Sequence, residues 1–228
     1  LMCSVPRFWE KVYDGVQEKI AETTGIKKTL MLDAIRVGKI HNIDYLRKGK
    51  TPPLMLRLKY KFYEKTIYSL LKKTIGIENG NFFPTAGAAV SDEICEFVHS
   101  VGINMLVGYG LTESTATVSC FENEGYEIGS VGTVMPDLEV KIGENNEILL
   151  RGKTITKGYY RKPEATAAAI DKDGWFHTGD AGYLKGNQLY LTERIKDLFK
   201  TSNGKYISPQ ALETKLAIDR YIDQIAVI

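Results

Sequence analysis

The chain has 228 residues, of which 43% are hydrophobic and 25% charged, and its 30 Lys and Arg against 28 Asp and Glu give a net charge of +2. This balance is typical of a globular protein with a sizeable core and excludes a disordered, collagen-like or disulfide-stapled chain. The small net charge does not favour nucleic acid as a partner, and no apolar run approaches the roughly 18 residues of a membrane span.

The first part of the sequence predicts two helices, over residues 6–20 and about 21–41. Ser4 is a candidate cap for the first helix, and Pro6 suits its first turn. Apolar residues then recur at helical spacing, at Phe8, Trp9, Val12, Val16 and Ile20.

Residues 44–75 are basic, with nine Lys and Arg against two acidic residues. Apolar residues within this segment keep helical spacing, at Ile67, Leu70, Leu71 and Ile75. We favour a surface helix whose apolar stripe packs on the core while its lysines face water. A cationic amphipathic helix on an anionic membrane is the alternative, and it would make the protein a peripheral membrane protein.

After residue 76 the sequence changes to short strands with glycine-rich turns and a few helices. We expect a strand at 81–84, a small-residue loop at 85–90, and a helix that starts at Ser91. Further predicted elements are strands at 103–107, 148–150, 187–191 and 205–207, a helix at 210–217, and a final apolar run at 222–228 that reads as an interrupted strand.

Three segments carry residue types suited to nucleotide chemistry, and the first is Gly108–Ser114. Its glycines would let the backbone approach anionic oxygens, Thr112 offers a hydroxyl to phosphate, and Glu113 offers a carboxylate to magnesium. It lacks the third glycine of a dinucleotide fingerprint. An ordinary strand-to-helix turn capped by Thr112 explains the segment equally well.

The second and third segments are Gly174–Gly182 and Glu193–Pro209. Asp180 lies between small residues and could accept both hydroxyls of a ribose, or it could simply cap a tight turn. We interpret His177 as structural, because no metal-ligand partner stands at a suitable spacing. Alternation along the third segment predicts three cations on one side of a strand, Arg194, Lys196 and Lys200, which would meet a polyphosphate or merely face solvent.

Taken together and in this order, these segments resemble the adenylate-forming superfamily of acyl-CoA synthetases, luciferases and peptide-synthetase adenylation domains. The resemblance covers essentially the whole chain, in the stretches Thr85–Val90, Gly108–Ser114, Gly129–Gly132, Glu147–Tyr160, Trp175–Asp180 and Glu193–Glu213. Within the superfamily the sequence is most similar to long-chain fatty acyl-CoA ligases, because Val5–Tyr13 resembles their V-P-R-x-x-E-K-x-Y stretch.

The resemblance implies a mixed α/β fold: the C-terminal part of the large N-terminal domain (mixed sheets, flanking helices and a small β-barrel-like subdomain), followed by the start of a small α+β lid domain. We place the boundary so that residues 1–194 form the AMP-binding part and residues 195–228 begin the lid. The family's phosphate loop would precede residue 1 and its adenylation lysine would follow residue 228. We therefore expect a ligase fragment that is nearly inactive in adenylation by itself.

The resemblance also assigns roles to individual residues. It implies catalytic roles for Thr112 at phosphate, Glu113 at magnesium and Lys196 at the hinge of the lid domain. The implied nucleotide and coenzyme A contacts are Gly87 and Ala88 along the adenosine and acyl site, Gly108, Tyr109, Gly110 and Leu111 near adenine, Asp180 and Arg194 at the ribose, and Lys200 and Gly204 on the face that swings in for the second half-reaction. Ala86 replaces a glycine of the pattern, which leaves the chain-length preference open.

The implied activity is ATP-dependent, magnesium-assisted formation of an acyl-adenylate, followed by transfer of the acyl group to coenzyme A. A long-chain fatty acid is the expected substrate. Alternatives are the same chemistry on a medium-chain or aryl acid, and a non-catalytic nucleotide- or acyl-binding module. Three widely spaced cysteines and the absence of a secretory signal favour a cytoplasmic protein, and fatty-acid chemistry extends this to the inner membrane surface.

Overall fold

The computed structural model describes residues 2–122, 125–195, 199–200, 206–207, 209–216, 219, 221–222 and 225–227. It divides into two compact units, one of Leu1–Val107 with Glu122–Ile128 and one of Gly108–Phe121 with Gly129–Ile228. Among the residues so described, no helix is both long and apolar enough to cross a bilayer.

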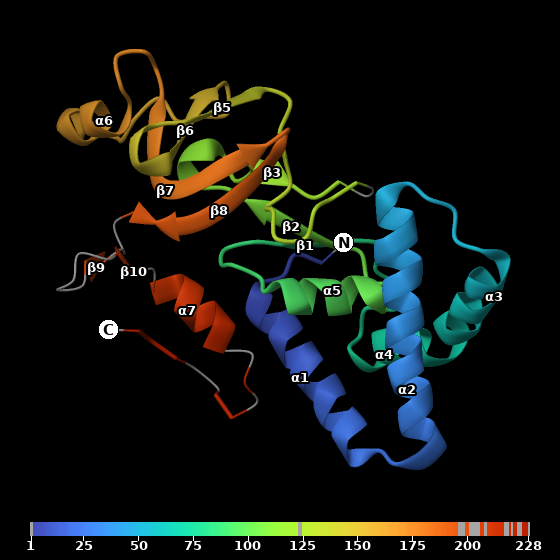
Figure 1. Ribbon diagram of the computed structural model, residues 1–228. Coiled ribbons are helices and arrows are strands. Elements are labelled where there is room, and N and C mark those ends of the chain that lie inside the picture. The colour runs from blue at the N-terminus through green and yellow to red at the C-terminus, as the bar shows by residue number, and fades with distance from the viewer. Residues whose placement is uncertain are drawn as a thin grey trace. The chain divides into compact units, whose positions relative to one another are not determined.

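The first unit is mainly helical (Figure 1). The two predicted N-terminal helices are confirmed, and a π-helical segment, Lys39–Tyr45, prolongs the second one. A second π-helical segment, Glu64–Tyr68, joins the two short helices of the basic region. The helices of this unit are α1 (Pro6–Glu22), α2 (Gly25–Gly38), α3 (Leu54–Tyr63), α4 (Ser69–Thr74) and α5 (Asp92–Ser100).

Ser4 does not cap α1, so that prediction is wrong. The residue at the cap position is Val5, which makes no side-chain cap. The Ser4 hydroxyl instead lies 2.8 Å from Thr85 Oγ1 and accepts a 2.9 Å hydrogen bond from the indole of Trp9. Trp9 is completely buried, and its N–H needs an acceptor there, which is why the serine is used for packing rather than for capping.

The basic segment, residues 44–75, does not pack its apolar stripe on the core in the way that we favoured. Ile67, Leu71 and Ile75 are only half-buried, and Leu70 is 65% exposed. Tyrosines fill the packed face instead: Tyr68 is 1% exposed and donates a 2.7 Å hydrogen bond to the carbonyl of Ala34. The apolar stripe of this region is therefore not fully covered within the described residues.

The strand pair of the first unit supports the predicted β–α–β order. β1 (Phe83–Thr85) pairs in parallel with β2 (Met105–Tyr109), and α5 connects them. Ser91 caps α5 as predicted, because its hydroxyl accepts the backbone N–H of Ile94. β2 belongs to both units, since its last two residues pair with β3 in the second unit.

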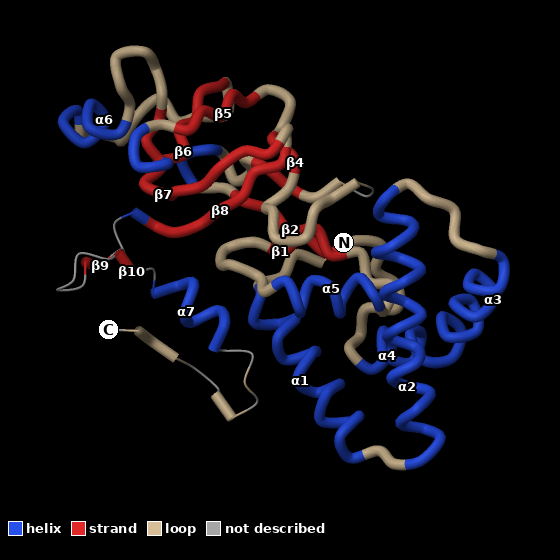
Figure 2. Tube along the Cα trace, in the orientation of Figure 1, coloured by secondary structure: helices blue, strands red, loops and turns tan. Residues whose placement is uncertain are grey.

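The second unit is a β-structure that runs β3-β4-β8-β7-β6-β5 from the end of β2, with antiparallel pairing throughout (Figure 2). β5 and β6 form a hairpin, and the strand predicted at 148–150 lies within β6. Its core contains Val118, Ile148, Leu150, Phe176 and Leu189. Its elements are β3 (Ser119–Cys120), β4 (Thr133–Val134), β5 (Leu138–Ile142), β6 (Glu147–Gly152), α6 (Pro163–Ala169), β7 (Phe176–Lys185), β8 (Gln188–Arg194), β9 (Phe199–Lys200), β10 (Tyr206–Ile207) and α7 (Pro209–Leu216).

The two units together contain parallel and antiparallel strand pairs flanked by helices, so the predicted mixed α/β class is confirmed. β9 pairs with β10, which corresponds to the strand predicted at 205–207, while residues 201–205 lie outside the described residues. The described residues of the final apolar run, 222 and 225–227, are not in a strand. The domain boundary placed between residues 194 and 195 coincides with the end of β8 and stays a prediction.

Candidate active site

Three of the predicted ligand-binding residues meet around one carboxylate in the second unit. Asp180 and Arg194 are directly opposite each other on β7 and β8, and Arg194 Nε lies 3.3 Å from Asp180 Oδ1. The hydroxyl of Tyr109, at the end of β2, donates a 2.7 Å hydrogen bond to Asp180 Oδ2. These residues are far apart in the sequence, and the pairing register of the sheet brings them together.

The surroundings of Asp180 supply its carboxylate with a hydrogen-bond donor and leave part of its acceptor capacity unused. Burial of Tyr109, together with its bond to Asp180 and the negative charge of that group, raises the pKa of the phenol far above its usual range, so the phenol stays a donor. The Asp180 side chain is 13% exposed, and each of its oxygens keeps a second lone pair beyond the bonds described. Such a carboxylate can accept further hydrogen bonds from two neighbouring hydroxyls, as a ribose presents them.

Tyr109 is only 8% exposed, and its ring packs in the core of the second unit. Its role near adenine stays a prediction. The alternative reading of Asp180 as the cap of a tight turn is wrong, because Asp180 lies within β7, at a place where the strand pairing is irregular.

The loop after β2 is shaped by its own backbone. Thr112–Ser114 form a single 3₁₀ turn, and the Ser114 hydroxyl binds both the N–H and the carbonyl of Leu111. Thr115 and Ala116 both adopt positive φ, 55° and 80°, which is a strained arrangement for residues with side chains. A Cβ on Gly110 would lie 1.4 Å from the Ala116 carbonyl oxygen, so this glycine is required by the fold of the loop.

Glu113 and Thr112 present their side chains from this loop. Glu113 Oε1 accepts a 2.9 Å hydrogen bond from the hydroxyl of Tyr159, and this bond is the main reason why the pKa of Tyr159 is raised. The backbone carbonyl of Glu113 accepts a second bond, 2.7 Å long, from the N–H of Thr156. Thr112 is exposed, with its hydroxyl available to a ligand.

The donor set fits a nucleotide-bound magnesium ion but not a site made by protein alone. Within the described ranges, no group of three or more His, Cys, Asp or Glu side chains is arranged to hold a metal. A magnesium ion that accompanies a nucleotide needs only one or two carboxylates, because phosphates and water complete its shell. Glu113 supplies one such carboxylate, with Oε2 not used by Tyr159.

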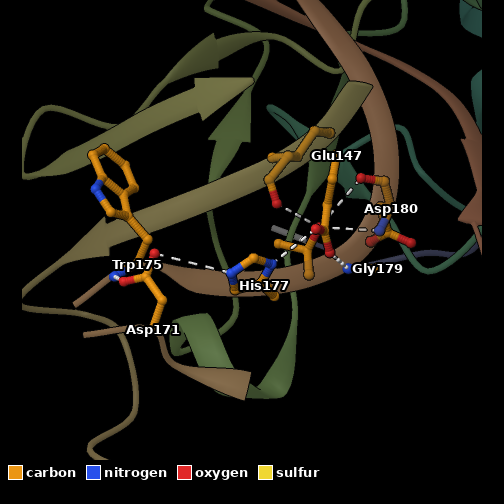
Figure 3. Close-up of polar contacts among 8 residues, drawn as sticks. Glu147, Asp171, Trp175, His177, Gly179 and Asp180 are labelled. Carbon is orange, nitrogen blue, oxygen red and sulfur yellow. Dashed lines mark hydrogen bonds and ion pairs between the residues drawn. The ribbon is translucent and has the colours of Figure 1, made fainter. Parts of the chain in front are cut away.

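A second polar cluster lies directly before Asp180, and its members come from two strands that are far apart in the sequence (Figure 3). The carboxylate of Glu147, on β6, contacts His177 Nδ1 at 2.8 Å and the N–H of Gly179 at 2.9 Å, both on β7. His177 Nε2 lies 4.0 Å from Asp171. His177 therefore has two acidic neighbours, Glu147 through the pairing of β6 with β7 and Asp171 through the turn before β7.

Two of the interacting residues, Glu147 and Tyr159, were not among the predicted site residues. Both fall inside the stretch Glu147–Tyr160 that resembles the superfamily, which was the available signal.

The remaining predicted residues are distributed elsewhere. Gly87 and Ala88 are exposed in the loop after β1, in the first unit, and Gly87 has a φ of 98°. Gly108 packs close to β3, because a Cβ there would lie 3.1 Å from the Ser119 carbonyl oxygen. Lys200 is in β9, opposite Tyr206, but its side chain is not among the described ones, and Lys196 and Gly204 lie outside the described residues.

Comparison with known proteins matches residues 1–160 to the family described as AMP-binding enzyme. Among curated proteins, the chain is 30% identical over 98% of its length to the peroxisomal long chain acyl-CoA synthetase 7 of Arabidopsis thaliana. It is 31% identical over its full length to the long-chain-fatty-acid–CoA ligase FadD15 of Mycobacterium bovis. It spans only 33% and 37% of the lengths of these two relatives.

Solved structures of adenylate-forming enzymes share the fold. An Escherichia coli MenE variant with bound OSB-AMS is 34% identical over 60% of the chain and 29% of its own length, with a TM-score of 0.52. O-succinylbenzoate coenzyme A synthetase from Bacillus subtilis, in complex with ATP and magnesium ion, is 27% identical over 60% of the chain and 31% of its own, with a TM-score of 0.54. The adenylation domain of a Mycobacterium chelonae carboxylate reductase covers 97% of the chain and 31% of its own at 21% identity and a TM-score of 0.67, a likeness of fold alone.

Proposed function

This chain belongs to the AMP-binding enzyme family, and from that premise we propose that it is part of an AMP-forming ligase that joins a long-chain fatty acid to coenzyme A. The observation that carries the proposal is the Asp180 carboxylate, held between Tyr109 and Arg194 with acceptor capacity left for a ribose. The long-chain acid is supported by the names of the curated relatives.

The reaction activates a carboxylate, which by itself resists attack by a thiol. One carboxylate oxygen forms a bond to the α-phosphorus of ATP, and the bond from that phosphorus to the bridging oxygen breaks, releasing pyrophosphate. The thiolate of coenzyme A then bonds to the acyl carbon, and AMP leaves with the electrons of the acyl–oxygen bond. Because charge accumulates at phosphorus, catalysis depends mainly on positioning and electrostatic stabilisation.

The site residues of this chain would position the nucleotide and its metal ion. Asp180 would bind the ribose hydroxyls, and Arg194 would keep the carboxylate oriented from across the strand pair. Thr112 would donate its hydroxyl to a phosphate oxygen, and Glu113, oriented by Tyr159, would hold magnesium. The magnesium ion, when bound, neutralises phosphate charge.

An aryl acid is the second candidate substrate, because the two O-succinylbenzoate-related structures are 34% and 27% identical to this chain. We would measure AMP release with coenzyme A and a ladder of carboxylic acids, using the full-length protein that carries this chain. Turnover that rises into the long-chain range is the expected result. Turnover restricted to short or aromatic acids would overturn the fatty-acid assignment, and nucleotide binding without turnover of any acid would favour a binding module.

A second candidate function is peripheral association with an anionic membrane, favoured by one face of α3. Leu54, Met55, Leu58 and Phe62 are between 56% and 78% exposed, although each is a large apolar residue. Arg57 follows Leu54 by three residues and Lys61 follows Leu58 by three, so exposed cations border the apolar stripe. An anionic bilayer matches both properties, because its acyl boundary takes the stripe and its headgroups take the cations. This would place a cytoplasmic protein at the inner membrane surface.

The test is sedimentation of the full-length protein with vesicles of phosphatidylcholine, with and without phosphatidylserine. We expect binding only to the anionic vesicles, a decrease at high salt, and at least about a tenfold loss in the double variant Leu58→Glu, Phe62→Glu. Leu32→Glu, at a 49% exposed leucine of α2, is the matched control and should bind like the wild type. Equal binding by both variants would mean that another part of the protein, or a second copy, covers α3.

A further inference from the structure

The strand pair β6–β7 is interrupted at the residues that end in Asp180. Glu147 pairs with Ala181 and Leu149 pairs with His177, so the single residue Ile148 faces the three residues Thr178–Asp180. Extra residues on one strand bend it and leave ladder groups without their regular partners. We call Thr178–Asp180 the bulge.

Side chains replace the missing ladder bonds across the bulge. The Thr178 hydroxyl donates a 2.8 Å bond to the Ile148 carbonyl and accepts a 3.0 Å bond from the N–H of Asp180. The N–H of Gly179 donates to Glu147 Oε1 at 2.9 Å, so a carboxylate stands where a backbone carbonyl would normally accept. Gly179 has a φ of 74°, a conformation that favours glycine.

Glu147 itself is held in place from the other side. Its Oε2 lies 2.8 Å from His177 Nδ1, and its side chain is only 19% exposed. The neighbouring Asp171 accepts the N–H groups of Asp173 and Trp175 through Oδ1 and thereby fixes the turn before β7. Figure 3 shows Glu147 between His177 and Gly179, with Asp180 beside Gly179 at the end of the bulge.

We propose that Glu147 is a positioning residue for the nucleotide: its carboxylate fixes the Gly179 N–H and thereby aims the Asp180 carboxylate at the ribose hydroxyls. This inference rests on the proposed function, since it presupposes a nucleotide at Asp180. Glu147 needs no contact with the ligand. The affinity for a ligand that lacks ribose hydroxyls should therefore not change when Glu147 is replaced. A general structural role would instead lower the affinity for both kinds of ligand.

The experiment compares the affinities of the full-length protein for AMP and for 2′,3′-dideoxy-AMP by calorimetry. The variants are Glu147→Ala, which removes the acceptor, and Glu147→Gln, which keeps a neutral one. Glu139→Ala is the matched control, because it also removes a carboxylate from this sheet, but one that pairs only with Arg151 in the described contacts.

We expect Glu147→Ala to weaken AMP binding by about tenfold and Glu147→Gln by about threefold, with dideoxy-AMP affected by less than about twofold. The Glu139→Ala variant should match the wild type with both ligands. In combination with Asp180→Asn, the effect of Glu147→Ala should largely disappear, because the group that it positions has been changed. Hydrogen exchange should show the Gly179 amide losing protection in Glu147→Ala only.

Two results would overturn the inference while leaving the proposed function intact: equal losses for both nucleotides, or additive effects of Glu147→Ala and Asp180→Asn. If the wild type itself does not prefer AMP over dideoxy-AMP, the ribose role of Asp180 fails, and the inference fails with it. If Glu147→Ala does not fold, Glu147→Gln decides the question. A threefold loss for AMP alone supports the inference, and equal losses for both nucleotides overturn it.

Discussion

At the scale of single residues, Tyr109 shows how one hydroxyl can orient a carboxylate, that of Asp180. It donates to Asp180 Oδ2 from a buried position, while Arg194 approaches the other oxygen. A buried acceptor that loses its donor costs about 1–3 kcal/mol, so the orientation of Asp180 depends on this phenol.

We therefore predict that Tyr109→Phe weakens AMP binding by about three- to tenfold and destabilises the protein by about 1 kcal/mol. The ring still fills its place in the core, so the loss reports the hydroxyl alone. Tyr183→Phe, at an exposed tyrosine that stacks on Tyr190, is the control and should change neither quantity. Calorimetry with AMP and thermal unfolding measure both effects. An unchanged AMP affinity in Tyr109→Phe would show that Asp180 is oriented without it.

The residue types of the site were readable from the sequence, but their partners were not. Asp180, Arg194, Thr112 and Glu113 lie in short motifs whose order resembles the superfamily. The contacts of Glu147 with His177 and of Glu113 with Tyr159 join residues 30 and 46 positions apart. Local spacing has no period that reaches so far, and only strand pairing and loop packing produce these contacts.

At the scale of elements, the motif Gly129–Gly132 illustrates a glycine that serves packing. Gly132 precedes β4 with a φ of 91°, and a Cβ there would lie 2.0 Å from the carbonyl carbon of Cys120, the last residue of β3. The two strands pair at this point, so neither backbone can move away without breaking the ladder.

Gly132→Ala should destabilise the second unit by more than about 3 kcal/mol, because backbone overlap adds to the cost of positive φ. Gly186→Ala isolates the conformational cost, since Gly186 also has positive φ, 61°, but open space around its Cβ. It should lose only about 1 kcal/mol. Denaturant unfolding of both variants gives the comparison. Similar losses in the two variants would contradict the steric argument.

Helix and strand types followed from hydrophobic periodicity and from caps such as Ser91, while element bounds differed by a few residues. Periodicity did not predict which apolar side chains are buried. In the basic region it indicated an apolar face that includes Leu70, but the structure buries Tyr63 and Tyr68 there and leaves Leu70 65% exposed. A period shows which residues share a face, and burial depends on which other elements pack there.

At the scale of the whole molecule, a buried histidine links stability to pH. His99 is 6% exposed and stacks on Tyr126 with ring centroids 4.4 Å apart. Burial is the main reason why its pKa is lowered to about 4. Unfolding restores the usual value near 6.5, so between these two values the unfolded chain binds more protons than the folded one.

The contribution of His99 to stability should therefore be constant above about pH 6.5 and should fall as the pH decreases from 6.5 towards 4, by up to about 3 kcal/mol. His99→Gln removes the titrating group and should flatten this part of the curve, even if it lowers stability at every pH. Denaturant unfolding between pH 4 and 8 measures both slopes. Equal slopes for wild type and variant would assign the pH dependence to other groups.

The sequence alone determined the family, the mixed α/β class, and most helices and strands, and it singled out the residues that we propose for the nucleotide, because these depend on residue type and on spacing within a few turns or strands. Only the tertiary structure decided that Tyr109 and Arg194 contact Asp180, that Glu147 accepts the Gly179 N–H within the bulge, and that α3 leaves an apolar face exposed. The physical reason is that pairing register, irregular ladders and burial arise between segments, and no segment encodes its distant partner.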